Sequence, residues 1–565
     1  MPRTRSLFLL KRTYSLSFLL ILITSITFIR VPFFDFVLLE DPTHLDSHPQ
    51  FSSSIKTSAL DVWKKPYLIY MPLTYSVWRA ASLVSPPKSL RAIPRTRTGV
   101  LKEFRFNSVL FHFLPLLFHL LAVFTLFWLL CFMTRHPVGS FFGALLFAIH
   151  PLQVESVAWV SGLKQPLGGF LGLSAILLFL LAQETPPISK TFKLLYGVAS
   201  LLFLMSVLSN PSFVAIPLVT GSLMYFLYKR ERFLVSSRLL VYWILASIPI
   251  LGWGQSTRSW SHTAHLPINV KEKVVLGLDS LSFYFSKILF PLHLGIDYGR
   301  TPEWVLTQTS VYTTASIFFI FIFSFTLFLR WNKIHWALAC EAFFILALLP
   351  TLVFNRLIFQ TSSSVADHDI YLALGGVAMA TAFILKSHIN KSFVQFSLIF
   401  VFVLLATKTF FQTGTWRNTS SLLSHALKIN SQSSLAHRTL GFHFEREEDF
   451  EQSISHFKSA AALSPQNLDF HKLGTIYLSL GKPLEAKTNY EKALALNPLS
   501  SSDYHGLGLS WLGLGNKLLA QENFSKANAL APRQLSSLNA LNQVKREMFT
   551  ETQQTEKKRR RRARR

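Results

Sequence analysis

The sequence predicts an all-α protein, with a polytopic membrane core of helices followed by a solenoid of repeated helix pairs. Half of its 565 residues are hydrophobic and only 15% are charged. Many apolar runs approach the roughly 20 residues that cross hydrocarbon. After Trp416 the composition changes and an internal repeat of 33 or 34 residues begins. A soluble globular protein is therefore excluded, and two domains of different character are expected.

The membrane core is predicted from its apolar runs. They lie near residues 14–29, 107–132, 138–159, 166–183, 191–208, 211–228, 238–253, 310–329, 336–353, 370–386 and 394–411. Both cysteines, Cys131 and Cys340, lie inside such runs, so no disulfide framework and no zinc-finger spacing is present. We therefore expect about eleven spans.

The charges suggest how these spans are oriented. Arg3, Arg5, Lys11 and Arg12 precede the first run, which favours an N-terminus in the cytoplasm. Residues 31–106 then form the first extracytoplasmic loop. The segment 271–291 places Asp279, Ser282 and Ser286 on one helical face, which favours an interfacial or re-entrant helix. If it does not cross, the C-terminal domain lies outside the cytoplasm; if it crosses, there are about twelve spans and that domain is cytoplasmic. We expect the former.

The repeats divide the chain into residues 1–415, 416–535 and 536–565. Five positions recur in register in three copies: Leu440-Gly441, Leu473-Gly474 and Leu507-Gly508; Phe444, Tyr477 and Trp511; Phe457, Tyr490 and Phe524; Ala460, Ala493 and Ala527; Pro465, Pro498 and Pro532. This is the tetratricopeptide repeat (TPR) pattern, in which small residues let paired helices approach and proline ends the second helix. Such an array usually binds protein on its concave face, although it could also only cover the membrane domain.

The basic tail is the last feature that suggests a partner. The net charge is +27, and eight positive charges lie in residues 557–565. By composition we expect this tail to be disordered. Anionic membrane lipid, or no specific partner, is favoured over nucleic acid.

Two stretches carry residues suited to chemistry. Glu40 and Asp41 are adjacent carboxylates just after the first span, where like charges raise at least one pKa and favour a general base. His150, Glu155 and Lys164 occupy a short link between two apolar runs, where facing lipid would be costly. A charged loop start and a solvated hairpin are the simpler readings. No spacing matches a metal site.

Several motifs resemble those of the transmembrane and TPR-containing O-mannosyltransferase-like proteins, which have the GT-C fold. The resemblance covers about residues 30 to 532. It rests on FVLLEDPTHLDSHPQF (36–51), Tyr70-Met71-Pro72-Leu73-Thr74, the pair His112 and His119, HPLQVESVAWV (150–160), Ala366-Asp367 with Tyr371-Leu372, and Trp416-Arg417.

The resemblance implies a glycosyltransferase that moves a sugar, such as the hexose mannose, from a polyprenyl-phosphate carrier to a protein hydroxyl outside the cytoplasm. Asp41, or Glu40 with it, would be the base. The same outer cavity would be lined by His150, Glu155 and Lys164, with Lys164 near the leaving phosphate. Asp367 and His368 would form the opposite wall. No cofactor is expected beyond the lipid-linked donor, and the concave TPR face would hold the acceptor, with Phe444, Tyr477 and Trp511 as structural repeat positions.

The sequence also departs from this pattern in four places. Gly162-Leu163-Lys164-Gln165 stands where Glu-Arg-Lys-Asp is usual, and His368-Asp369 stands where Arg-Tyr is usual. Met71 replaces an arginine, and Asn210 replaces a lysine. These losses of charge motivate a second hypothesis, a catalytically inactive membrane scaffold that recruits a protein through its repeats. A transporter or polymer ligase is a third, but the paired broken helices of a transporter are missing.

Overall fold

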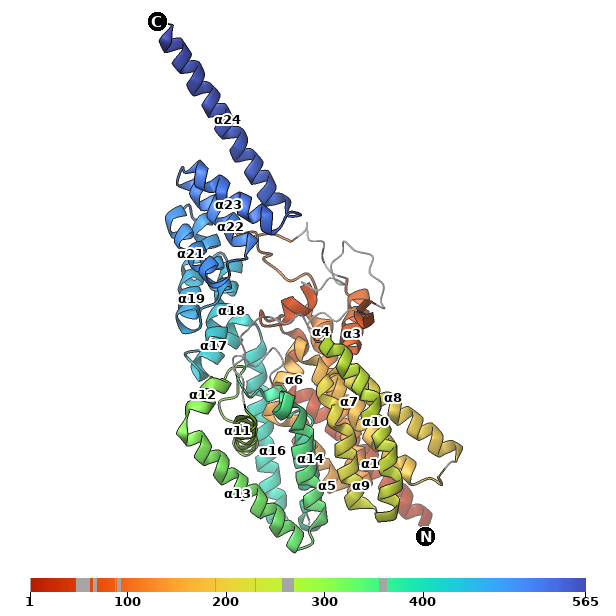
Figure 1. The fold of residues 1–565 in the computed structure, drawn as a ribbon. Helices are drawn as coiled ribbons and strands as arrows, with labels where there is room; N and C mark the ends of the chain where they lie inside the picture. The colour runs from red at the N-terminus through yellow and green to blue at the C-terminus, as the bar shows by residue number, and fades with distance from the viewer. Residues whose placement is uncertain are drawn as a thin grey trace. The chain divides into compact units, whose positions relative to one another are not determined.

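The computed structural model describes residues 2–46, 61–64, 69–86, 88, 93–187, 189–228, 230–256, 269–354, 363–389 and 391–564. Within these ranges all regular elements are helices, apart from one isolated bridge between Arg95 and Leu101. This confirms the expected all-α class. The chain divides into two compact units (Figure 1): unit 1 contains Met1–Ser89 and Phe104–Asn430, and unit 2 contains Leu90–Glu103 and Ser431–Arg565.

Unit 1 holds the apolar helices. The longer ones are α1 (Pro2–Thr27), α3 (Pro72–Val84), α4 (Ser108–Thr134), α5 (Pro137–Ile149), α7 (Lys164–Gln183), α8 (Lys190–Ser209), α9 (Ile216–Leu227), α10 (Arg230–Ser256), α11 (Val270–Leu289), α13 (Thr309–Trp331), α14 (His335–Phe354), α15 (Leu374–His388), α16 (Ser392–Thr413) and α17 (Thr419–Ile429). Short elements join them: η1 (Val31–Phe33), η2 (Pro42–Asp46), α2 (Asp61–Lys64), η3 (Pro151–Gln153), α6 (Val154–Ala158), η4 (Val160–Leu163), η5 (Pro211–Ala215), α12 (Pro302–Thr307), η6 (Asp367–Ile370) and η7 (Gly414–Trp416).

The centre of unit 1 is built from α4, α5, α7, α8 and α15. Helix α7 packs along α8 and α4, and α5 packs along α15. The last pair is close because α5 carries glycine at the contact: a Cβ added at Gly143 would lie 2.3 Å from the backbone oxygen of Ala378. Without a hydrophobic drive between helices in lipid, such close backbone contact is a main source of attraction. Short elements after α5 then hold the polar hairpin against this centre.

The expected count of about eleven spans is not confirmed. Among the described residues, eight helices are long and apolar enough to cross a membrane, and the bent pair Pro137–Ile149 with Pro151–Ala158, which meets at 50°, makes a ninth if it is one span. The other two runs form the shorter apolar helix Pro211–Leu227, made of η5 and α9, and the 15-residue helix α15. A crossing helix needs about 20 residues, so these two are too short to cross alone. Helix α11 is not among the spanning candidates, in keeping with its expected interfacial character.

Unit 2 contains the three predicted helix pairs: α18 (Ser434–Arg446) with α19 (Phe450–Leu463), α20 (Asn467–Ser479) with α21 (Pro483–Leu496), and α22 (Ser501–Gly513) with α23 (Lys517–Leu530). The repeated glycine explains the pairing. A Cβ on Gly441, Gly474 or Gly508 would come within 2.9, 2.9 or 2.7 Å of an aromatic ring of its partner helix. Those rings belong to Phe457, Tyr490 and Phe524, so the glycine and aromatic positions specify the pairing together.

Polar contacts at equivalent positions join successive repeats. One residue of each first helix bonds to the third residue of the next first helix: Arg438 Nε to Asp469 Oδ1 at 2.6 Å, His471 Nδ1 to Asp503 Oδ1 at 2.6 Å, and His505 Nδ1 to Ser537 Oγ at 3.2 Å. Both carboxylates are buried, and burying a charge requires a hydrogen-bonded partner. These contacts therefore fix the stacking of the array.

The expected disordered tail is instead helix α24 (Leu535–Ala563), the single long helix that extends from α22 and α23 in Figure 1. Its first turns complete the array, because Ser537, Leu541 and Val544 are buried. Beyond them the sequence is rich in glutamine, glutamate, lysine and arginine, which are good helix formers, so the helix continues exposed to solvent.

A piece of the first loop also belongs to unit 2 rather than to the membrane core. The turn around Gly99 is closed by the Arg95–Leu101 bridge and packs on the end of α18. Arg446 Nε donates to the Leu101 carbonyl at 2.7 Å, and Lys102 Nζ lies 2.7 Å from Glu448. The predicted domain boundary at residue 415 therefore assigns Leu90–Glu103 to the membrane domain, whereas this segment packs with the repeats.

Candidate functional site

Asp41 is the most completely enclosed of the predicted site residues. It follows η1 and an extended stretch, and its side chain is fully buried. The backbone N–H of Val37 donates to Oδ2 at 3.1 Å, while the backbone N–H and the hydroxyl of Ser161 donate to Oδ1 at 3.1 and 2.6 Å. Ser161 lies in η4 on the hairpin between α5 and α7, so the first loop and the hairpin meet at this carboxylate.

Burial raises the pKa of Asp41 to about 7, although the hydrogen bonds from Ser161 and Val37 oppose the rise. The neighbouring charge of Glu40 contributes a smaller increase. Repulsion between the two adjacent carboxylates, which the sequence suggested, is therefore only a minor cause of the raised pKa of Asp41. Desolvation is the main cause. A carboxyl group whose pKa lies near neutral pH suits proton transfer, because both of its forms are populated there.

Glu40 has the opposite character. Its Oε2 atom lies 3.8 Å from Lys164 Nζ and 3.6 Å from His44 Nε2. Burial raises the pKa of Glu40, but the Lys164 ammonium and the nearby His44 ring outweigh it and bring the pKa down to about 2. Glu40 is therefore an ionised partner of Lys164 near neutral pH, and only Asp41 of the two carboxylates is poised to take up a proton.

The hairpin from His150 to Lys164 also reaches the second part of the site. Glu155, on α6, accepts from His368 Nδ1 at 2.7 Å, and His368 Nε2 lies 3.7 Å from Asp369 Oδ1. Burial lowers the pKa of His368, but the charges of Glu155 and Asp369 outweigh it and bring the pKa to about 9. His368 is therefore a fixed cation near neutral pH, although the sequence analysis counted this position among the losses of charge.

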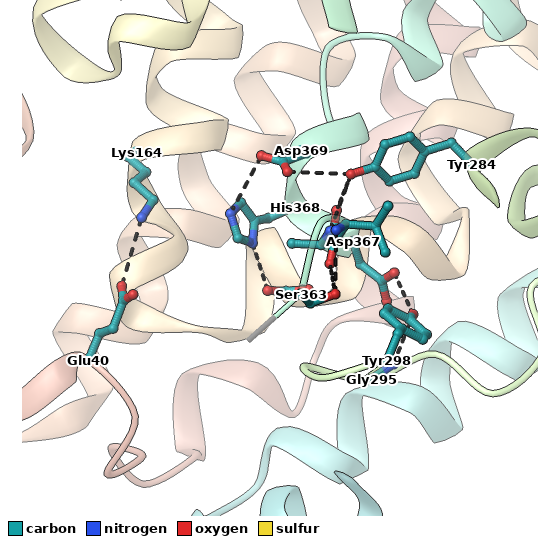
Figure 2. A network of polar contacts seen from close by, with 12 residues as sticks. Glu40, Lys164, Tyr284, Gly295, Tyr298, Ser363, Asp367, His368 and Asp369 are labelled. Carbon is teal, nitrogen blue, oxygen red and sulfur yellow. Dashed lines mark hydrogen bonds and ion pairs between the residues drawn. The ribbon is translucent and has the colours of Figure 1, made fainter. Parts of the chain in front are cut away.

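A tyrosine pair completes this wall, as Figure 2 shows. The Tyr298 hydroxyl donates to Asp367 Oδ1 at 2.6 Å, and the Tyr284 hydroxyl lies 3.4 Å from Asp369 Oδ2. Burial, followed by the charge of Glu155, raises the pKa of Asp367 well above its usual range. The sequence analysis did not predict Tyr284, Tyr298 or Ser161 as site residues. Only Ser161 could have been noticed, because it is a polar residue directly after the motif at 150–160.

Lys164 lies between the two parts. Its Nζ is 5.6 Å from the centre of the Trp159 ring and faces Glu40 (Figure 2), and its charge also acts on His368 and Asp369. His368 in turn acts on Glu40. The predicted residues Glu40, Asp41, Glu155, Lys164, Asp367 and His368 therefore form one electrostatically coupled group. A fixed ammonium in such a group is suited to holding a phosphate.

His150 stands apart from this group. Its Nε2 contacts the backbone oxygen of Ile288 on α11 at 3.1 Å, and its Nδ1 accepts from the Leu152 N–H at 3.3 Å. With both ring nitrogens engaged by backbone, His150 shapes the start of the hairpin. His119 is similar, since its ring nitrogens contact the Tyr371 hydroxyl at 2.9 Å and the Ala148 carbonyl at 3.0 Å.

The departures from the family pattern also have structural explanations. Met71 and Leu163 are both buried in one apolar cluster with Tyr75 and Trp78. The two positions where the family pattern has arginine are therefore both occupied by apolar residues of the same cluster. Asn210 caps η5, since its side chain accepts from the Ser212 N–H at 3.1 Å.

The aromatic repeat positions of unit 2 contact side chains within the repeats. Phe444 stacks on His456 with ring centres 5.4 Å apart. Tyr477 and Trp511 lie under Lys458 and Lys487, at 6.0 and 4.9 Å from the ring centres.

Comparison with known proteins finds relatives that match much of this chain. Protein O-mannosyl-transferase TMTC3 of Mus musculus is 25% identical over 465 residues, which cover 73% of this chain and 49% of that protein. Protein O-mannosyl-transferase F38B6.6 of Caenorhabditis elegans is 24% identical over 312 residues, covering 54% of this chain and 42% of the other. The chain resembles the TPR-containing protein O-mannosyltransferases. It spans about half the length of these curated relatives.

A family model and solved structures also match parts of the chain. Residues 470–498 match the tetratricopeptide repeat family. The NMR structure of the first TPR domain of the human RPAP3 protein covers 21% of this chain and 95% of that domain, at 16% identity and a TM-score of 0.21. The crystal structure of the yeast Tom70 covers 69% of this chain and 93% of Tom70, at 13% identity and a TM-score of 0.22.

Proposed function

We propose that this membrane protein is a glycosyltransferase that moves a sugar from a polyprenyl-phosphate carrier to a hydroxyl group of a protein, outside the cytoplasm. The observation that carries the proposal is the buried Asp41 carboxylate, whose pKa of about 7 makes it a base at neutral pH. The O-mannosyl-transferase names of the relatives supply the reaction class, with mannose as the first sugar to test.

In this mechanism Asp41 accepts the proton of an acceptor serine or threonine hydroxyl. The freed oxygen forms a bond to the anomeric carbon of the sugar, and the bond from that carbon to the phosphate oxygen breaks. The carrier phosphate leaves with the electron pair of that bond. Lys164 and the charged His368 are the cations of the coupled group, and a cation fixed in advance stabilises the developing phosphate charge without reorganisation. Ser161 holds Asp41 in orientation through its two hydrogen bonds.

The repeats would present the acceptor on the same side of the membrane as Asp41. The support comes from unit 2 itself, because the Arg95–Leu101 turn of the first loop is bound to α18. One loop that carries Asp41 and also contributes a turn to the repeats supports a location of both on one side of the bilayer. TPR arrays commonly bind protein segments, so a protein acceptor is the partner that we propose.

The test is sugar transfer by the purified chain with a polyprenyl-phosphate sugar and an acceptor peptide rich in serine and threonine. We expect Asp41→Asn to lower transfer at least about 100-fold, as for loss of a general base. Asp35→Asn, an exposed carboxylate on the same loop, is the matched control and should stay near wild type. Equal transfer by wild type and Asp41→Asn would refute the proposal.

The second candidate is a catalytically inactive scaffold. It is favoured by the burial of Met71 and Leu163 in one apolar cluster, where the family pattern places arginines. Under this alternative the wild-type chain transfers no sugar. It would capture a protein partner equally well with Asp41→Asn or Glu155→Gln, and lose it when α18–α23 are removed. Any Asp41-dependent transfer would rule the scaffold out.

A further inference from the structure

Helix α11 buries some polar residues and exposes some apolar ones, although Lys271, Lys273 and Ser286 are exposed as well. Asp279, Ser280 and Tyr284 are buried on its inner face. By contrast, Val274 on the helix and Leu289 at its last turn are more than half exposed, at 55% and 57%. A helix in water buries its apolar face, so this arrangement indicates that the outer face of α11 meets lipid.

The polar face of α11 is bound to the candidate site. Asp279 forms an ion pair with Arg300, and the Tyr284 hydroxyl donates to the Ala366 carbonyl at 3.2 Å, next to Asp367. At the other end the backbone oxygen of Ile288 is held by His150 at 3.1 Å. Helix α11 is therefore a wall with the ionised site residues on one side and lipid on the other.

Lys287 lies at the C-terminal end of this wall. Its Nζ is 5.4 Å from the centre of the Phe283 ring and 5.3 Å from that of Tyr298, and it donates to the Leu292 carbonyl at 2.6 Å. Tyr298 is the residue that donates to Asp367 at 2.6 Å, so one ring separates Lys287 from the site. No carboxylate within the described ranges lies at ion-pair distance from the Lys287 ammonium.

Exposed apolar side chains surround this lysine. Leu289, Phe290 and Leu292 are 57%, 67% and 54% exposed, and all three follow Lys287 within five residues. A cation with a partly buried stem beside exposed apolar groups matches a lipid whose charged head is a phosphate. The neighbouring rings of Phe283 and Tyr298, whose centres are 4.8 Å apart, lie beside the ammonium and favour the level of the membrane interface.

We propose that Lys287, with Leu289, Phe290 and Leu292, is the docking site for the phosphate and the first isoprene units of a polyprenyl-phosphate lipid. This inference rests on the proposed function, and it names where the donor first docks, before its phosphate reaches Lys164 and His368 for transfer. Continuity with Tyr298 and Asp367 favours this lipid over an ordinary phospholipid, because the phosphate that docks here borders the residues that would handle the sugar.

The electrostatics agree with this assignment. Burial lowers the pKa of Lys287, and the neighbouring Arg300 lowers it further, whereas Asp367 raises it. Arg300 is already paired with Asp279, and Asp367 is bound to Tyr298. Lys287 is thus a partly desolvated cation whose neighbours compensate it only in part. A phosphate anion would supply the missing charge.

The experiment measures binding separately from transfer. Full-length protein in detergent is titrated with polyprenyl phosphate, and bound lipid is counted by native mass spectrometry, with phosphatidylglycerol and inorganic phosphate as competitors. We expect Lys287→Gln to weaken polyprenyl-phosphate binding about tenfold, which corresponds to about 1.4 kcal/mol. Lys273→Gln, an exposed lysine on the same helix, should change it less than twofold. Phe290→Ser should also weaken binding, and thermal unfolding checks that each variant is folded.

Three results would overturn the inference: wild-type binding by folded Lys287→Gln, equal loss in Lys273→Gln, or equal competition by phosphatidylglycerol. Displacement by inorganic phosphate alone at millimolar concentration would also refute it, because the apolar residues would then contribute nothing. A wild-type chain that binds through Lys287 yet transfers no sugar would refute the proposed function and leave this site standing.

Discussion

Replacing Asp41 by asparagine should make the protein more stable at neutral pH while removing its activity. The aspartate carboxyl has an ordinary pKa of 3.8 and a pKa of about 7 in the folded chain. Between these two values the unfolded chain has already lost the proton that the folded chain still holds. The wild type therefore loses stability as the pH rises from about 4 to about 7, whereas an amide does not titrate.

The size of this effect follows from the two pKa values. Each pKa unit corresponds to about 1.4 kcal/mol, so the rise from 3.8 to about 7 destabilises the wild type by about 4 kcal/mol at and above neutral pH. Asparagine retains an oxygen for Ser161 but presents an N–H toward the Val37 N–H, which costs about 1–3 kcal/mol at every pH. The pH-dependent part is separate from this constant loss.

The assay is denaturation of wild type and Asp41→Asn in detergent at several pH values from 4 to 8. We expect the stability of the variant relative to wild type to rise by about 4 kcal/mol over this range and then to level off. Asp35→Asn, at an exposed position of the same loop, should give a flat difference. A flat difference for Asp41→Asn as well would show that its carboxyl is not desolvated, and the assignment of the base would fail.

Three further predictions concern other residues. Ser161→Ala removes a hydroxyl hydrogen bond to ionised Asp41, worth about 1.5–3 kcal/mol, so the pH dependence of transfer should move about 1–2 pH units upward; an unmoved profile would contradict the contact. His368→Gln should destabilise the chain by about 3 kcal/mol below pH 6.5, because the pKa of His368 rises from 6.5 to about 9, and the loss should vanish above about pH 9; denaturation against pH measures this sign. Gly143→Ala should lower the thermal midpoint, because its Cβ would meet an α15 carbonyl at 2.3 Å, whereas Gly197→Ala has open space within 4 Å and should be harmless.

The features that are predictable from this sequence are those that arise from periodicity. The repeats were predictable because Gly441 contacts Phe457 in the same way as Gly474 contacts Tyr490. The same glycine–aromatic contact therefore recurs in each copy of the sequence pattern. Hydropathy located the apolar helices, but it did not show which of them are long enough to cross a membrane. Helices α9 and α15 are shorter than the apolar runs that predicted them. Composition failed for α24, where charged residues that are also helix formers continue a packed first turn.

The site was predictable only to the level of its motifs. The motifs identified Asp41 and Glu155 but could not divide the work between Glu40 and Asp41, which are adjacent in sequence and alike in chemistry. That division depends on which carboxylate meets Ser161 and which meets Lys164, and both partners lie more than 100 positions away. Tyr298 is similarly invisible, because its role depends on a contact with Asp367 across the fold.

Helix α11 shows why some information is absent from the sequence in principle. Its pattern places Asp279 and Ser282 on one face, and the same pattern describes a helix on a soluble protein or one between a polar site and lipid. The structure resolves the ambiguity, because Asp279 and Tyr284 are buried and Leu289 is exposed. The sequence pattern shows that a helix has a polar face and an apolar face. The surroundings of the helix decide which of the two faces is buried. With Asp279 buried and Leu289 exposed, Lys287 lies at the edge of the helix, between the candidate site and exposed apolar side chains.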